Sequence, residues 1–255
     1  MLKKIFILSC FIGTVLANGQ IMLPAYQAIQ YVDEIPQVTI CNQTWSAVNL
    51  DTSTYNDGTP IPQVTDTNVF AGLTTGAWCY YNNDPLLGNI YGKIYNWYAI
   101  AGIYDAASLS NPTLRKNIAP VGWHIPTKDE WKTLFINCLN NNLGYINSQL
   151  SESFNGPAAC ALRETGTTHW NSPNNSANNS TGFTALPGGL FYSGNAFTGI
   201  GDELTLWTST EYFTNSAWWC YIFRQIGLGT ICSNGSILFQ IEQKVQGAYA
   251  RCVKD

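Results

Sequence analysis

The chain has 255 residues, and 12 Lys and Arg against 16 Asp and Glu give it a formal net charge of −4. Nucleic acids are bound through clustered cationic side chains, so this balance argues against a nucleic-acid partner, and we expect none. Charged residues make up 11% of the chain and aromatic residues 13%, which excludes coiled coils and disordered acidic chains and predicts one loop-rich domain with β structure.

The N-terminus has the pattern of a cleavable export signal. Two lysines precede an apolar run at residues 5–16, which is too short to span a bilayer. Small residues allow cleavage before Asn18 or before Gln20, and we take residues 1–19 as the signal peptide. Lipidation of Cys10 is the less favoured alternative, because the apolar run continues past that residue. We therefore expect a secreted protein, or one at the outer cell surface, without a transmembrane segment.

The next segments change in character along the chain. Residues 20–36 show no periodicity and are interpreted as a linker or edge segment, so the domain is expected over residues 37–255. The β-rich composition of residues 38–50 predicts one or two strands around residues 42–43. Residues 51–90 are rich in Asp, Asn, Thr, Pro and Gly, which predicts a long ordered loop region.

Two segments have the residue spacing of helices. Residues 93–101 place apolar and aromatic side chains at helical intervals, although the aromatic content leaves a strand open. Thr127 and Glu130 have the spacing of a capping box, in which each side chain bonds the other residue's backbone amide. The helix that begins there is expected to end near Gly144. Its buried stripe consists of Trp131, Leu134, Phe135, Cys138 and Leu139.

The second half of the chain is β-rich after a polar loop at residues 165–182. Asn234–Gly235 is a strong type I′ hairpin signal, because both central residues of that turn take positive φ. A further hairpin centred on Ile226 would place Cys220 opposite Cys232, within reach of a cross-strand disulfide. The predicted strands cover residues 204–210, 217–224, 229–233, 236–241 and 248–253.

Cysteine usage fits an oxidising compartment. Removal of the signal takes Cys10 from the 8 cysteines and leaves an odd number, so at least one is free or bonded between molecules. No two of them form a CxxC pair, so a structural zinc site is not expected. Cys138 is interpreted as a buried thiol that packs in the helix stripe.

Blocks of sequence spread over nearly the whole mature chain resemble, in order, the Fibrobacter succinogenes major paralogous domain family. They are QTW at 43–45, WCYYNND at 78–84, YGKIYNWYA at 91–99, GWHIPTKDEW at 122–131, LRETGTTHWNSPN at 162–174, TGFTALPGG at 181–189, LWTSTEY at 206–212, AWWCY at 217–221 and RCVKD at 251–255. This family is abundant in secreted and cell-surface proteins of Bacteroidetes and Fibrobacteres. More remotely, IPTKDEW resembles a block of the formylglycine-generating, sulfatase-modifying enzymes.

The resemblance implies an α+β, C-type-lectin-like fold. In such a fold two helices flank small antiparallel sheets, the terminal strands pair, and long loops are displayed on one side. If the strand around residues 38–41 pairs with the last strand, Cys41 and Cys252 can be bridged. The long loop that such a bond closes would stabilise the fold by roughly 4–5 kcal/mol in the chain-entropy account.

We do not expect this chain to have the formylglycine-generating activity of the enzymes that it remotely resembles. That reaction uses a closely spaced cysteine pair that binds copper, and the nearest pair here is Cys220 and Cys232, without the flanking sequence of those enzymes. A structural disulfide explains this pair better. The two histidines, His124 and His169, have no nucleophile beside them in sequence, so a hydrolytic triad is not assembled from spacing alone.

Five carboxylates inside or beside the quoted blocks have two interpretations. They can ligate calcium, which prefers carboxylate and backbone oxygens. Alternatively, they accept hydrogen bonds that hold the loops, which is the interpretation we favour. We therefore expect no cofactor, with calcium as the alternative. The residues are Asp84, Glu164, Asp202, Glu203 and Glu211.

Aromatic residues predict the binding surface. Alternation along the strand at 217–224 places Trp219, Tyr221 and Phe223 on one face, with Trp218 and Cys220 on the other. One face belongs to the core, and an exposed aromatic face suits stacking on sugar rings or anchoring a protein.

We therefore expect residues 222–247, including Arg224, to form the binding surface with Tyr221 and Trp219, and His169 and Trp170 to contact ligand from their loop. The chain is interpreted as a non-enzymatic adhesion or ligand-binding module for a glycan or a protein. The alternatives are an extracellular enzyme with a divergent formylglycine-generating-type site, or a structural part of a surface appendage.

Overall fold

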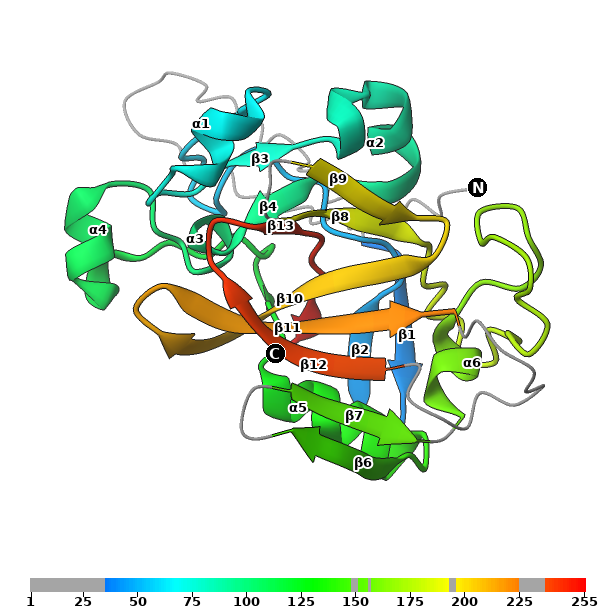
Figure 1. Cartoon of the computed structure of the whole chain (residues 1–255). Coiled ribbons are helices and arrows are strands. Elements are labelled where there is room, and N and C mark those ends of the chain that lie inside the picture. The colour runs from blue at the N-terminus through cyan, green and yellow to red at the C-terminus, as the bar shows by residue number, and fades with distance from the viewer. Residues whose placement is uncertain (1–34, 148–150, 156, 193–195, 225–236) are drawn as a thin grey trace, which may run out of the picture. The chain divides into compact units, whose positions relative to one another are not determined.

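The domain is built from two sheets with short helices at their margins (Figure 1). The computed structural model describes residues 35–147, 151–155, 157–192, 196–224 and 237–255. The predicted signal peptide and nearly all of the predicted linker lie outside these residues. Residues 36–255 form one compact unit. Each described helix is too short or too polar to cross a bilayer.

The strand order differs between the two sheets. The first sheet runs β1 (Gln37–Ile40), β2 (Gln43–Ser46), β14 (Val253–Lys254), β5 (Trp123–His124). The second runs β3 (Trp78–Cys79), β4 (Ile94–Asn96), β13 (Gly247–Ala248), β8 (Gly188–Tyr192), β10 (Glu203–Phe213), β11 (Ser216–Phe223), β12 (Ile237–Gln243), β7 (Ser151–Asn155), β6 (Asn142–Asn147), with β9 (Ala196–Ile200) paired to β8.

The helices of the described residues are short, and there are more of them than the two expected. Most of the regular structure is sheet, so the fold is mixed α and β. The α-helices are α1 (Thr67–Ala71), α2 (Pro85–Tyr91), α3 (Trp97–Ile100), α4 (Ala106–Ser110), α5 (Lys128–Lys132) and α6 (Ala158–Leu162). Two 3₁₀ turns, η1 (Tyr81–Asn83) and η2 (Pro112–Leu114), and a π-helix, η3 (Thr133–Cys138), complete the set.

Local polar residues explain where several helices begin. The capping box at α5 is confirmed, because Glu130 N–H donates to Thr127 Oγ1 over 3.2 Å and Thr127 N–H donates to Glu130 Oε2 over 2.7 Å. The helix continues only through η3, and Asn140 then adopts φ 54°. The prediction that it reaches Gly144 is therefore wrong, because the chain has already turned into β6.

Two further predictions are refined by side-chain capping. Residues 93–101 contain both β4 and α3, because Asn96 Oδ1 accepts from Ala77 and Ala99 amides and so closes the strand and starts the helix. The loop region at 51–90 contains α1 and α2, whose N-termini are capped by Asp66 and Asp84.

The central hairpin joins β10 and β11 through Thr214 and Asn215. On its other side β11 pairs with β12, and the register places Phe239 opposite Cys220. The hairpin centred on Ile226 is therefore wrong. Cys220 is a free thiol, so the predicted bond to Cys232 is not formed. Cys232, the expected strand at 229–233 and the Asn234–Gly235 turn lie outside the described residues.

The terminal strands pair, as the resemblance implies, but through β2 rather than β1. Val253 lies opposite Trp45, and Cys252 bonds Ser46 through N–H to Oγ at 3.0 Å. Cys252 therefore lies beside Ser46 at the end of β2, whereas Cys41 lies in the turn that precedes the start of β2 at Gln43. Both cysteines are free thiols, and the predicted Cys41–Cys252 bond is wrong.

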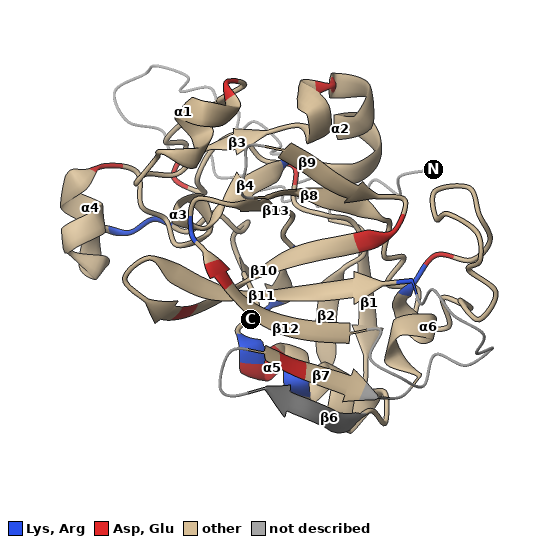
Figure 2. Ribbon diagram, viewed as in Figure 1, with Lys and Arg blue, Asp and Glu red and all other residues tan. Residues whose placement is uncertain are grey.

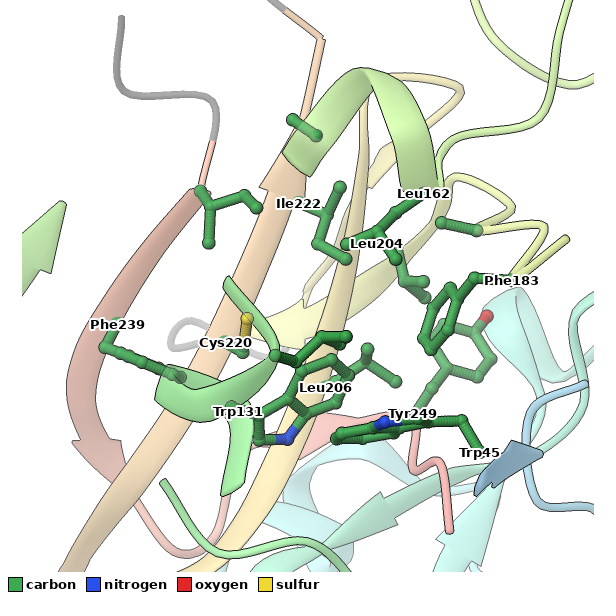
Figure 3. Close-up of a cluster of buried hydrophobic side chains, with 14 of the residues drawn as sticks. Trp45, Trp131, Leu162, Phe183, Leu204, Leu206, Cys220, Ile222, Phe239 and Tyr249 are labelled. Carbon is green, nitrogen blue, oxygen red and sulfur yellow. The ribbon is translucent and has the colours of Figure 1, made fainter. Parts of the chain in front are cut away.

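The core lies where the two sheets meet α5 (Figure 3). Trp45 of β2 and Trp131 of α5 are fully buried, with ring centroids 4.3 Å apart. The aromatic ring of Tyr249 packs on Gly188, where an added Cβ would approach that ring to 2.6 Å, and its hydroxyl donates to Gly188 O. Trp45, near the start of the domain, and Tyr249, near its end, therefore belong to one core cluster with side chains of β10 and β11.

Charged residues are sparse along the ribbons and gather where α5 meets β7 (Figure 2). Glu152 accepts from Lys128 and Lys132 at 2.6 and 2.7 Å, and the Lys128 ammonium lies 3.3 Å from the Trp218 ring centroid. Burial lowers the pKa of Lys128. This network fixes α5 against the sheet.

Arg251 is a buried charged residue that bonds several segments of the fold. Its side chain is 1% exposed, and its guanidinium donates to Asn49 Oδ1 at 2.7 Å and to the carbonyls of Ser46, Phe183 and Thr184 at 2.7, 3.1 and 3.1 Å. Burial lowers the pKa of Arg251 to about 9. One side chain thus ties the last strand to β2 and to the loop before β8.

We expect Arg251→Lys to lower the free energy of unfolding by about 3–5 kcal/mol, because an ammonium group cannot reproduce the four donations of the planar fork. Urea denaturation monitored by tryptophan fluorescence measures the change. Arg115→Lys is the matched control, since Arg115 makes only a 4.0 Å contact with Glu211 and should change stability by less than about 0.5 kcal/mol. Equal effects of the two variants would contradict the role of Arg251.

A second contact ties the C-terminal residue to the start of α5. His124 Nδ1 lies 2.6 Å from Asp255 Oδ1, and Nε2 lies 2.8 Å from Glu130 Oε1. Burial disfavours the imidazolium, but the hydrogen bonds to Asp255 and Glu130 outweigh it and raise the pKa of His124 above 6.5. The charged form of His124 is therefore the one that stabilises the fold.

The stabilisation by His124 is expected to be complete below about pH 6.5 and to disappear as the pH rises through the raised pKa of the folded state. The difference in free energy of unfolding between the wild type and His124→Gln should therefore be largest near pH 6 and shrink toward pH 8.5 or so. Urea titrations over this range measure it. A constant difference across the range would show that His124 acts only as a neutral hydrogen-bond partner.

Candidate functional site

The two faces of β11 have different roles. Trp218, Cys220 and Ile222 point into the core that α5 covers, as Figure 3 shows for Cys220 and Ile222. Trp219, Tyr221 and Phe223 alternate with them and lie on the opposite face, which we call the outer face. This division confirms the predicted alternation and identifies the core side.

Aromatic rings cluster on the outer face. Trp219 lies beside Trp207 of β10 and beside Tyr221, with ring centroids 5.1 Å apart in both pairs, and Tyr192 of β8 is 6.3 Å from Trp219. Trp207 and Trp219 are fully buried, whereas Tyr192 and Tyr221 are half-buried. The two indoles are therefore covered by the protein, and the two tyrosines are the more accessible rings of this cluster.

A carboxylate and two amides stand beside these rings. The register places Gln240 of β12 opposite Trp219, and its Nε2 donates to Glu242 Oε1 at 2.6 Å. Glu242 also accepts from the side chains of Gln246 and Tyr192, while its burial outweighs these bonds and raises its pKa. Tyr192 thus belongs to both the aromatic and the polar part of the face.

Glu203, at the start of β10, supplies a second carboxyl group. Burial, with the nearby charge of Asp202, raises the pKa of Glu203 to about 7. Its carboxylate lies over Gly199, where an added Cβ would come within 2.1 Å of Oε1, and where φ is +79°. Glycine at 199 is therefore needed for the Glu203 side chain to occupy this place.

Glu203 and Glu242 both act on Tyr221, whose pKa is raised by burial and then by these two carboxylates. Burial has left Trp219 Nε1 and Thr205 Oγ1 without a hydrogen-bond partner among the described residues. Such groups are costly unless a ligand or water bonds them. We call the set Tyr192, Glu203, Thr205, Trp219, Tyr221, Gln240 and Glu242 the aromatic–carboxylate face.

Phe223 and Arg224 lie at the end of β11 that adjoins Glu203. Phe223 is half-buried and pairs with Glu203 across the hairpin. The Arg224 side chain is engaged by the protein itself, because Nε donates to Asp202 and Nη1 donates to Ser172 O at 3.1 Å. Arg224 therefore holds the neighbouring loop to the hairpin. Of the predicted surface at 222–247, residues 225–236 lie outside the described residues.

The structure does not bring His169 and Trp170 into this set. Trp170 is 1% exposed, and its Nε1 donates to Ala185 O at 3.0 Å. The ring of His169 pairs with Glu164 at 2.9 Å and meets Tyr91 edge-on. Trp170 is therefore a core residue, since its ring packs under Arg163, and His169 is held within the loop.

The carboxylates considered for calcium have protein partners, with one exception. Asp84 caps α2, Glu164 pairs with His169, Asp202 with Arg224, and Glu211 with Lys244. Glu203 accepts no hydrogen bond from the described residues, which contain no group of three or more His, Cys, Asp or Glu side chains placed to hold a metal.

The thiol considered for copper chemistry faces the core. Cys220 is fully buried beside Leu206 and Phe239, and burial raises its pKa well above 9. A thiol in apolar surroundings is disfavoured as a thiolate, which is the form that binds soft metals. Cys220 is therefore a packing residue of the core.

The sequence did not single out Tyr192 and Thr205, and it included Gln240 and Glu242 only as part of the predicted surface at 222–247. A local signal for Gln240 and Glu242 exists, because residues 239–242 alternate apolar and polar, and this period places both on the outer face beside Trp219. Tyr192 joins the face only through the order of strands, since β8 lies next to β10 in space.

The sequence profile of the Fibrobacter succinogenes major domain family matches residues 38–254, and the chain belongs to this family. The match covers both sheets and every residue of the aromatic–carboxylate face. No curated protein and no solved structure matched the chain.

Glu203→Gln is expected to stabilise the protein at alkaline pH. The wild-type carboxyl is protonated in the folded state up to about pH 7, so the wild type loses stability between about pH 4.5 and 7, and the neutral amide avoids this loss. The variant should exceed the wild type by about 1–3 kcal/mol near pH 8 and match it near pH 4.5.

Glu211→Gln is the control for this prediction. It removes the partner of Lys244, whose side chain is 2% exposed, so it should lower stability at neutral pH instead. Urea denaturation at both pH values measures all three proteins. A destabilised or pH-independent Glu203→Gln variant would show that Glu203 is ionised and well solvated.

Proposed function

We propose that the domain is a non-enzymatic ligand-binding module of the secreted or cell-surface type, and that its ligand is a glycan bound at the aromatic–carboxylate face. The observation that carries the proposal is the combination on this face of two half-buried tyrosines, the covered indoles and two carboxyl groups. A C-type-lectin-like architecture, in which paired terminal strands support a sheet and long loops, is part of the same proposal.

The chemistry of the face matches that of a sugar ring. A pyranose presents C–H groups on its faces and hydroxyl groups around its rim. Tyr192 and Tyr221 offer rings for the C–H groups. The carboxyl groups of Glu203 and Glu242 and the amide of Gln240 accept or donate hydrogen bonds to hydroxyls, and a Glu203 carboxyl with a pKa of about 7 does both.

The low charge of the face favours a glycan over a protein ligand. Arg224 is engaged by Asp202, so the face offers carboxyl groups, amides and aromatic rings without a free cation among its described residues. Protein interfaces of hot-spot type rely on protruding Trp, Tyr and Arg anchors. Here the indole of Trp219 is 0% exposed and cannot protrude.

A glycan array followed by calorimetric titration with the strongest hit tests the proposal. Tyr221→Ala should weaken binding by about tenfold or more, because it removes the stacking ring. Tyr221→Phe should keep most of the affinity. Phe213→Ala is the matched control, since Phe213 is an exposed aromatic residue at the far end of the same hairpin, at 63% exposure.

Three results would contradict the proposal. A blank array together with capture of a protein from the cell surface would replace the glycan by a protein ligand. A glycan that binds wild type and Tyr221→Ala equally would move the site elsewhere. Turnover of a peptide cysteine with copper present would favour an enzyme.

A further inference from the structure

Two free cysteines from distant parts of the sequence meet beside the first sheet. Cys41 is the exposed turn residue between β1 and β2, with φ 53°. Cys138 is the last residue of η3 and is half-buried at the margin of the core. Cys138 was predicted to be a buried packing thiol of the helix stripe, but the helix ends at this residue and its side chain is only partly buried against the core.

Direct contacts join the two thiols. The Cys138 side chain is hydrogen bonded with the Cys41 thiol, and the Asn42 backbone N–H donates to the Cys138 sulfur. Burial, and then the Cys41 thiol, raise the pKa of Cys138 to about 11. Cys138 therefore stays protonated at neutral pH while its sulfur faces the turn.

Two further contacts hold the β1–β2 hairpin against α5. Gln43 Nε2, two residues after Cys41, donates to Glu130 O of α5 at 3.1 Å. Trp45 of the same hairpin stacks on Trp131 of the same helix, with ring centroids 4.3 Å apart. The hairpin and the helix are thus held together by the core, so the two sulfurs are neighbours because of the fold.

We propose that Cys41 and Cys138 form a disulfide bond in the mature protein. The exposed Cys41 gives up its proton and attacks a donor disulfide, either oxidised glutathione or that of a thiol–disulfide oxidoreductase, which releases one donor thiol. Cys138 then gives up its proton and attacks the Cys41 sulfur of the mixed disulfide, which releases the second donor thiol. The protein loses two electrons and two protons, and the donor gains them.

The bond would lock the β1–β2 hairpin onto α5. It closes a loop of about a hundred residues, the length at which a cross-link constrains the unfolded chain strongly. Because β2 pairs with the last strand, β14, a bond that holds β2 in place also supports the pairing of the two ends of the domain. This inference concerns the fold and stands apart from the proposed glycan site.

Purified full-length protein, incubated with oxidised glutathione or with dithiothreitol, tests the proposal. Non-reducing digestion and mass spectrometry of the oxidised sample should give a peptide pair joined through Cys41 and Cys138. The melting temperature of the oxidised sample should exceed that of the reduced sample by about 5–10 °C. Cys41→Ser should abolish this shift, and Cys79→Ala, at a buried free thiol, should keep it.

The shift is measured within each variant, so a variant that is itself less stable still gives a clear result. Alkylation of both Cys41 and Cys138 in the oxidised wild type would overturn the proposal. A map in which either cysteine is joined to a different one would overturn it as well, and so would a melting shift that persists in Cys41→Ser.

Discussion

The buried guanidinium of Arg251 is the constraint on which the rest of the domain depends. Its four acceptors among the described residues are neutral: the Asn49 side-chain amide and the Ser46 carbonyl from residues 46–49, and the carbonyls of Phe183 and Thr184. The buried charge is therefore tolerated only while both of these segments are in place. The residues around it, Tyr249 and Val253, extend the same connection to β10 and β2. These contacts hold the two ends of the domain together and hold β10 of the central hairpin beside them.

The two faces of the central hairpin, β10 and β11, carry different side chains. Its core face carries the apolar side chains that α5 covers, while its outer face carries the covered indoles, the two tyrosines and the carboxyl groups. The outer face keeps a feature that costs stability, the Glu203 carboxyl group whose burial raises its pKa to about 7. Groups with strongly shifted pKa values are common at functional sites, where ligand binding offsets their cost in folding free energy. This is the reason for proposing a binding site on this face.

Local signals were sufficient for part of the fold. The capping box, the alternation along β11 and the pairing of the ends were predicted, because each follows from a short pattern or from the family resemblance. The register of β11 with β12 was not predicted, because it depends on which segment of the chain pairs with β11. Cys220 was therefore expected opposite Cys232, whereas it lies opposite Phe239. The sequence singled out Trp219 and Tyr221 of the proposed face but not Tyr192, since the order of strands in space has no local sequence signature.

Native-state hydrogen exchange tests the role of the Arg251 connection most directly. The amides of Ser46, Tyr249 and Cys252 are bonded across this connection, to Cys252 O, Thr205 O and Ser46 Oγ. The account predicts that these amides exchange only through global unfolding and are as slow as the amides of β10 and β11. Faster exchange of the three amides, with β10 and β11 still protected, would show that the ends open on their own and would contradict the account.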